Sequence, residues 1–157
     1  REALAACAAA EEASAEDEGL ARDVMRHLFG ALWGDERFEE AKLLCEEAIA
    51  RYPQEPFFWE ALGDALAELA RQAREDPAAE EEVQRLLGRS VSALYRACEL
   101  APASVSAHRS LVKQLGAAGR VEEERTVAQL TIDRHLGIWQ HRLQRPDHWM
   151  PGLTSKP

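Results

Sequence analysis

Apolar side chains recur every three or four positions between residues 20 and 137, the spacing that places them on one face of an α-helix. Residues that end helices or form turns interrupt this pattern at Gly34-Asp35, Tyr52-Pro53, Asp76-Pro77, Pro102 and Gly119. The sequence therefore predicts an all-α fold of six helices in three antiparallel pairs, over residues 21–33, 37–51, 57–74, 77–100, 105–117 and 121–135.

Each predicted helix has an apolar face that we expect to point inward. In chain order these faces consist of Val24, Met25, Leu28, Phe29 and Leu32; Phe38, Ala41, Leu44, Cys45 and Ala48; Trp59, Leu62, Leu66 and Leu69; Val83, Leu86, Leu87, Val91, Leu94, Ala97 and Cys98; Leu111, Val112 and Leu115; and Val127, Leu130 and Ile132.

The two ends of the chain depart from this pattern. Residues 1–19 are rich in Ala and Glu and are predicted as a weakly anchored N-terminal helix or extension, with a solvated break from Glu16 to Gly19 before the first firm helix. The last helix should close at Leu136-Gly137, and residues 138–157 are predicted as an extended linker. This linker carries two Trp and three Pro, and a solvated tail would have fewer aromatic residues, so we expect it to dock onto protein.

Charge narrows the class of partner. The 157 residues include 28 acidic and 19 basic side chains, a formal net charge of -9. An acidic surface argues against nucleic acid, whose phosphates require basic residues, and against an anionic membrane. No apolar run reaches the roughly 18 residues that cross a bilayer, so no transmembrane segment is predicted. We expect the partner to be protein, either a downstream domain of the same protein or a larger complex.

No arrangement for catalysis, cofactor binding or metal binding stands out. Cys7, Cys45 and Cys98 are widely spaced, so Cys45 and Cys98 are interpreted as packing residues. Three of the five histidines, His135, His141 and His148, lie near the C-terminus but lack metal-ligand spacing. Phosphate-binding glycine loops are also absent from the sequence. We therefore expect the chain itself to be non-enzymatic.

The helix pairs resemble tetratricopeptide repeats. Trp59, Leu62, Gly63 and Leu66 resemble the motif of the first helix of such a repeat. Small residues such as Gly63 let neighbouring helices approach closely. Motifs of the second helix and the turns are found at Phe38, Ala41, Cys45, Ala48 and Pro53, at Ser90, Leu94, Ala97, Leu100 and Pro102, and at Gly119-Arg120-Val121. The resemblance implies an antiparallel helix-pair solenoid of about three units over residues 20–137.

The middle unit is about fifteen residues longer than the family spacing, between Leu66 and Ser90. Its extra residues favour helix and contain one break, at Asp76-Pro77, where Asp can cap a helix that starts with Pro. We expect two elongated helices that form a protruding hairpin. A structureless insertion is the alternative.

In a tetratricopeptide array the first helices line a concave groove. Here the resemblance places Asp23, Arg26, Phe57, Glu60, Asp64, Arg109 and Lys113 on that surface. It is acidic in the middle and basic at its end, and it lacks the converging cations of a carboxylate clamp. The groove could hold a foreign peptide or the chain's own tail, and solvated helix faces explain the same charges.

The linker resembles the junction that precedes the oxygenase domain in aspartyl/asparaginyl β-hydroxylases. The similarity lies in Ile138-Trp139-Gln140, Gln144-Arg145-Pro146, Pro151-Gly152-Leu153 and Lys156-Pro157. It implies a missing catalytic domain that uses Fe(II) and 2-oxoglutarate, with all metal and cosubstrate ligands in that domain. The resemblance assigns a structural role to the junction residues Trp139, Arg145, Pro146, Gly152 and Leu153. We expect Trp139, Arg145 and Trp149 to contact protein.

Two functional hypotheses follow. In the first, the chain is a non-catalytic scaffold or protein-interaction domain that precedes the oxygenase domain of a hydroxylase-like protein. In the alternative, it is a structural subunit of tetratricopeptide type that docks into a larger assembly without oxygenase activity. A stand-alone enzyme lacks a catalytic constellation in this sequence. The cellular compartment is left open.

Overall fold

The computed structural model describes the backbone of residues 2–144 and the side chains of residues 16–135. Within this range the protein is all-helical, as the sequence predicts, and contains no strand. The helices are α1 (Glu2–Gly34), α2 (Phe38–Arg51), α3 (Pro56–Ala73), α4 (Glu80–Leu100), α5 (Val105–Ala117) and α6 (Val121–Gln144), with a 3-10 turn, η1 (Pro77–Ala79), before α4.

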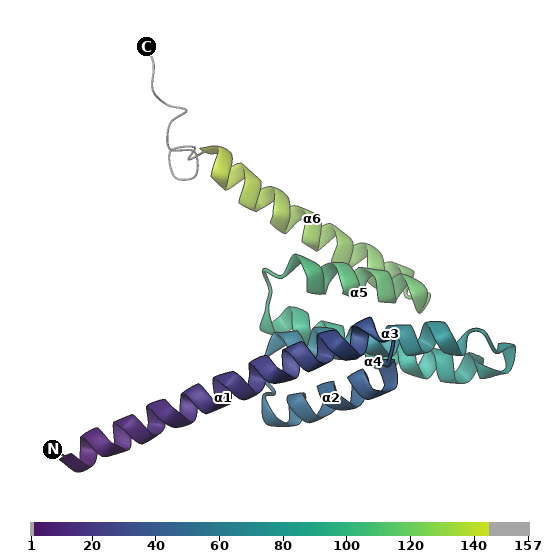
Figure 1. Ribbon diagram of the computed structural model, residues 1–157. Coiled ribbons are helices and arrows are strands. Elements are labelled where there is room, and N and C mark those ends of the chain that lie inside the picture. The colour runs from purple at the N-terminus through teal and green to yellow at the C-terminus, as the bar shows by residue number, and fades with distance from the viewer. Residues whose placement is uncertain (1, 145–157) are drawn as a thin grey trace.

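Consecutive helices pack against each other, and α3 also contacts both α1 and α5. Figure 1 shows the paired ends of α3 and α4 reaching beyond the neighbouring helices. This is the elongated hairpin expected for the middle unit, and it is helical rather than structureless. Asp76 caps η1 by accepting a hydrogen bond from the Ala78 amide at 2.9 Å, while the Arg74 guanidinium donates to the Ala117 carbonyl and ties the hairpin to the end of α5.

The contact between α3 and α4 forms the centre of the core. Gly63 lies so close to α4 that an added Cβ would be 2.5 Å from Leu94 Cγ. The buried Ser90 hydroxyl donates to the Gly63 carbonyl at 2.6 Å. Cys45 is fully buried in the same core, and Cys98 is half-buried beside Leu94, so the packing role predicted for both cysteines is confirmed.

Two kinds of turn occur twice. The α1–α2 and α5–α6 turns each contain a residue of positive φ, Glu36 and Gly119. In both, an arginine amide bonds a leucine carbonyl five residues back at 2.9 Å, and the same arginine pairs with a glutamate three residues on. The α2–α3 and α4–α5 turns also share their hydrogen bonds, at Ala48, Tyr52 and Glu55 in one and Ala97, Ala101 and Ser104 in the other.

Both ends of the helical region differ from the prediction. The expected break from Glu16 to Gly19 is wrong, because α1 continues without interruption from Glu2 to Gly34. The expected helix end at Leu136-Gly137 is also wrong, because α6 continues to Gln144. Residues 138–144 of the predicted extended linker are thus helical, and the rest of the linker lies outside the described residues.

Several predicted inward positions are exposed. Val24 is 57% exposed and Leu28 48%, because α1 turns Phe29 and Leu32 toward α2 and α3 instead. Leu130 and Ile132 are exposed on α6, which packs through Val127. On α3 the fully buried aromatic ring is Phe58, whereas Trp59 is partly buried and donates its indole N–H to the Pro53 carbonyl.

Candidate interaction site

A cleft of about 390 Å³ lies between α3 and α5 and is closed at one side by Trp33 of α1. Its α3 wall carries three carboxylates, Glu60, Asp64 and Glu68. Its α5 wall carries hydrogen-bond donors, namely Ser106, Arg109, Ser110, Lys113 and Gln114. We call this feature the α3–α5 cleft. Acceptors on one helix therefore face donors on the other.

Helix periodicity produces the two walls. Glu60, Asp64 and Glu68 are spaced by four residues, so they form one stripe along α3. The core stripe of the same helix contains Leu62 and Leu66. On α5, Arg109 and Lys113 are likewise one turn apart, and they flank a core stripe of Leu111 and Leu115.

Asp64 is the most perturbed acid of the cleft. Burial raises its pKa from 3.8 to about 6, and the negative charges of Glu60 and Glu68 act in the same direction. A hydrogen bond from Ser110 and the charge of Lys113 oppose this increase. The two walls are thus already coupled across the cleft through Asp64.

The two cations of the cleft, Arg109 and Lys113, differ from the other described cations in their lack of salt bridges and hydrogen bonds. Among the arginine and lysine side chains that the structure describes, only Arg109 and Lys113 form neither a salt bridge nor a hydrogen bond. All the others have such a partner. Acidic groups outnumber basic ones in this chain, so two cations without a salt bridge in one cleft leave positive charge available there, although the charge of Lys113 already acts on Asp64.

Four of the predicted interaction residues, Glu60, Asp64, Arg109 and Lys113, therefore meet in one cleft. Arg26 and Phe57 do not line it. The Arg26 guanidinium lies over the Phe57 ring, 5.4 Å from its centroid, and forms a 2.8 Å salt bridge with Glu55. Asp23 pairs with Arg26 as well. These residues hold α1 against the start of α3.

The remaining predicted residues cannot be placed at a site. Trp139 belongs to α6, but its side chain is not described, and Arg145 and Trp149 lie outside the described residues. Sequence reasoning missed Trp33, Glu68, Ser106, Ser110 and Gln114. The spacing could have identified most of them, because Glu68 follows Asp64 by four residues and Ser106, Ser110 and Gln114 are four residues apart. The position of Trp33 at the cleft depends instead on how α1 packs.

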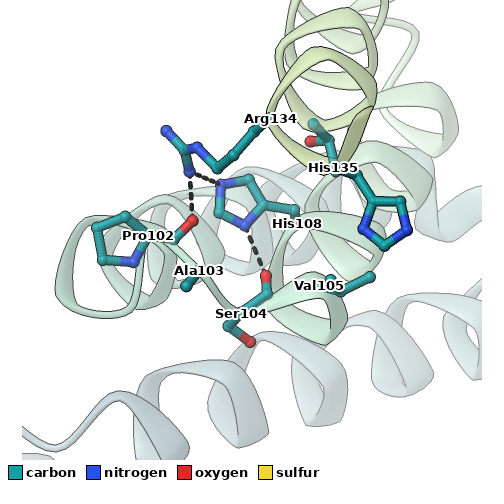
Figure 2. Close-up of a pocket in the computed structure, with 8 residues that line it drawn as sticks. Pro102, Ala103, Ser104, Val105, His108, Arg134 and His135 are labelled. Atoms are coloured by element: carbon teal, nitrogen blue, oxygen red, sulfur yellow. Dashed lines mark hydrogen bonds between the residues drawn. The ribbon is translucent and has the colours of Figure 1, made fainter. Parts of the chain in front are cut away.

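A second, much smaller cavity lies where the α4–α5 loop meets α6. His108 lies between two partners there (Figure 2): its Nδ1 donates to the Ser104 carbonyl at 2.7 Å, and its Nε2 is 3.5 Å from Arg134. Arg134 also donates to the Pro102 carbonyl. The volume is about 20 Å³, room for water but not for a ligand. This contact fastens α6 to the loop.

Other chemistry has little support in the part of the chain that the structure describes. No three His, Cys, Asp or Glu side chains gather there in a metal-binding arrangement. Burial raises the pKa of Cys45 to about 12 and that of Cys98 to about 11, so both thiols are far from the thiolate form that reacts. Among the described helices, none has both the length and the apolar character needed to cross a bilayer.

Comparisons with known proteins add no family assignment. No protein-family model matches this chain, and the search of curated proteins found no match either.

Proposed function

We propose that this chain is a non-catalytic helical-repeat domain that binds a segment of another protein in the α3–α5 cleft. One observation carries this proposal: the cleft combines a carboxylate wall with a donor wall whose two cations form no salt bridge within the described structure, although the charge of Lys113 acts on Asp64. A polypeptide offers carbonyl acceptors, amide donors and charged side chains together, so it can satisfy both walls at once.

The repeat assignment is part of the same proposal. The duplicated turns and the close approach of Gly63 to Leu94 support a tetratricopeptide-like solenoid of about three units. We further propose that the parent protein is similar to aspartyl/asparaginyl β-hydroxylases. The sequence motifs around Trp139, Arg145-Pro146, Gly152-Leu153 and Lys156-Pro157 support this similarity. Fe(II) and 2-oxoglutarate would then belong to a separate domain, and this chain would serve as its scaffold.

The alternative function, a structural subunit of a larger assembly, is favoured by a different surface. Leu20, Val24 and Leu28 are spaced by four residues on α1, and their exposed fractions are 65%, 57% and 48%. Such a stripe fits the apolar face of a partner protein's helix. Under this alternative, Val24→Lys would abolish assembly, while charge changes in the α3–α5 cleft would leave it intact.

A peptide selection tests the main proposal. Random twelve-residue peptides displayed on phage are selected on the wild-type protein and counter-selected on the Arg109→Glu/Lys113→Glu variant. Both substituted residues are exposed on α5 and make no salt bridge. Because Lys113→Glu also removes a charge that acts on Asp64, circular dichroism and thermal melting would verify that the variant keeps the fold.

We expect peptides that bind the wild-type protein and lose at least tenfold in affinity for the variant. An Arg85→Glu/Arg125→Glu variant is the matched control, since it makes the same change in net charge on exposed residues outside the cleft. If selection yields only peptides that bind all three proteins equally, the cleft is not a peptide-binding site.

A further inference from the structure

The charges of the α3–α5 cleft specify more than binding of a peptide in general. Resting on the proposed function above, we propose that the cleft selects a mixed-charge segment: an acidic side chain of the partner binds Arg109 and Lys113, and a basic side chain nearby in its sequence binds Glu60 and Asp64.

The acidic half of this partner follows from the α5 wall. Arg109 and Lys113 are one helical turn apart, so one carboxylate can approach both. Elsewhere in the described structure, arginines mostly pair with carboxylates, for example Arg26 with Glu55 and Arg89 with Glu46. Neither Arg109 nor Lys113 forms such a salt bridge, although the charge of Lys113 acts on Asp64. Ser106 adds a hydroxyl group beside them. A partner carboxylate therefore gains contacts that this chain does not supply.

The basic half follows from the α3 wall. Glu60, Asp64 and Glu68 line the opposite side of the same cleft, and only Glu68 has a salt-bridge partner, Arg71. A uniformly acidic segment bound to α5 would place its remaining charges against these carboxylates, and like charges in close contact disfavour a complex. A basic side chain of the partner removes this repulsion and pairs with Glu60.

Each wall of the cleft also disfavours a segment whose charges all have the same sign as its own. A segment with only basic residues would meet Arg109 and Lys113, just as one with only acidic residues would meet Glu60 and Asp64. The cleft thus discriminates by the pairing of charges rather than by net charge. The overall charge of -9 would, by itself, favour basic partners of any kind.

Three capped twelve-residue peptides test the inference. They have the same Ala and Gly framework and carry alternating Lys and Glu, only Lys, or only Glu. Binding is followed through the backbone amide signals of the isotope-labelled protein, which give both the affinity and the location. We expect the alternating peptide to bind at least tenfold more tightly than either uniform peptide, and its shifts to map to α3 and α5.

Variants separate the two halves. Arg109→Glu and Glu60→Lys should each weaken binding of the alternating peptide several-fold, whereas Arg125→Glu and Glu122→Lys, an exposed pair on α6, should leave it unchanged. Tighter binding of either uniform peptide, shifts outside the cleft, or no binding of the alternating peptide would overturn the inference. Peptides selected on phage that depend on the cleft but lack paired charges would overturn it too, yet leave the proposed function standing.

Discussion

Asp64 is the residue whose ionisation connects the candidate site to stability. Its raised pKa means that the folded protein holds this proton more tightly than the unfolded chain between about pH 4 and pH 6. The free energy of unfolding therefore falls as pH rises through that window, by up to about 3 kcal/mol from this group. Asp64 is thus a cost to the fold at neutral pH.

Asp64→Asn removes this ionisation. The free energy of unfolding of Asp64→Asn, measured by urea denaturation relative to wild type, should therefore be higher at pH 7 than at pH 4. Ser110→Ala is the companion variant, because removing the hydrogen bond that lowers the pKa of Asp64 should move the window to higher pH. If the stability difference between Asp64→Asn and wild type is the same at pH 4 and pH 7, the raised pKa is wrong.

Glu36 is a second residue that costs the fold free energy, in this case through its backbone conformation. Its φ of 58° lies in the left-handed region, which costs a non-glycine residue about 1 kcal/mol, whereas the matching position in the α5–α6 turn is Gly119. Glu36→Gly should therefore raise the free energy of unfolding by a few tenths to about 1 kcal/mol, measured by chemical denaturation. Gly119→Ala should lower it by a similar amount. Destabilisation by Glu36→Gly would mean that the Glu36 side chain has a role in the turn.

At the scale of helices, local signals predicted the boundaries well where capping residues mark them. Pro56 and Asp76-Pro77 mark helix starts close to the expected positions, although Asp76-Pro77 opens the 3-10 turn η1 and α4 begins at Glu80. The predicted range of α5 is identical to the observed one. The failures have a common cause. Each expected break depended on one glycine, Gly19 or Gly137, within a sequence that otherwise favours helix. A single glycine costs a helix only about 1 kcal/mol, so neither helix ends there.

Which apolar residues are buried was harder to predict than which residues are helical. Terminal helices have a neighbour on one side only, so Val24 on α1 and Leu130 on α6 follow the apolar period but meet no partner helix. The cleft shows the same limit. Spacing identifies the stripes of Glu60 and Arg109, yet only the packing of α3 against α5 brings the two stripes face to face.

The packing of α3 on α4 depends on Gly63. Gly63→Ala would gain about 1 kcal/mol of helix propensity but would place a Cβ 2.5 Å from the buried Leu94, and overpacking typically costs 1–3 kcal/mol. We expect a net loss of up to about 2 kcal/mol in the free energy of unfolding. Gly88→Ala on α4 is the control: nothing lies within 4 Å of its added Cβ, so it should stabilise. Equal effects of the two variants would contradict the close contact.

At the scale of the whole molecule, packing between consecutive helices makes stability unequal along the chain. Each of α2, α3, α4 and α5 is packed on both sides, whereas α1 and α6 each pack mainly against one neighbour. Most of the largest fully buried side chains, including Phe58, Leu66, Val83 and Leu94, lie on α3 and α4, and Leu111 and Leu115 lie on α5. Chains organised in this way open from their ends, because a terminal helix can detach without disturbing the central contacts.

Native-state hydrogen exchange measures this gradient directly. Amides of α3 and α4 should exchange only through global unfolding, while those of α1 before Leu20 and of α6 after Arg134 should exchange through local opening that costs far less free energy. A fully buried thiol, that of Cys45, supplies an independent readout, since its labelling rate should match the slowest amides. Slow exchange throughout α1 would show instead that its exposed Leu20, Val24 and Leu28 are covered. Tight self-assembly in solution would cover them, so this result would favour the assembly-subunit function.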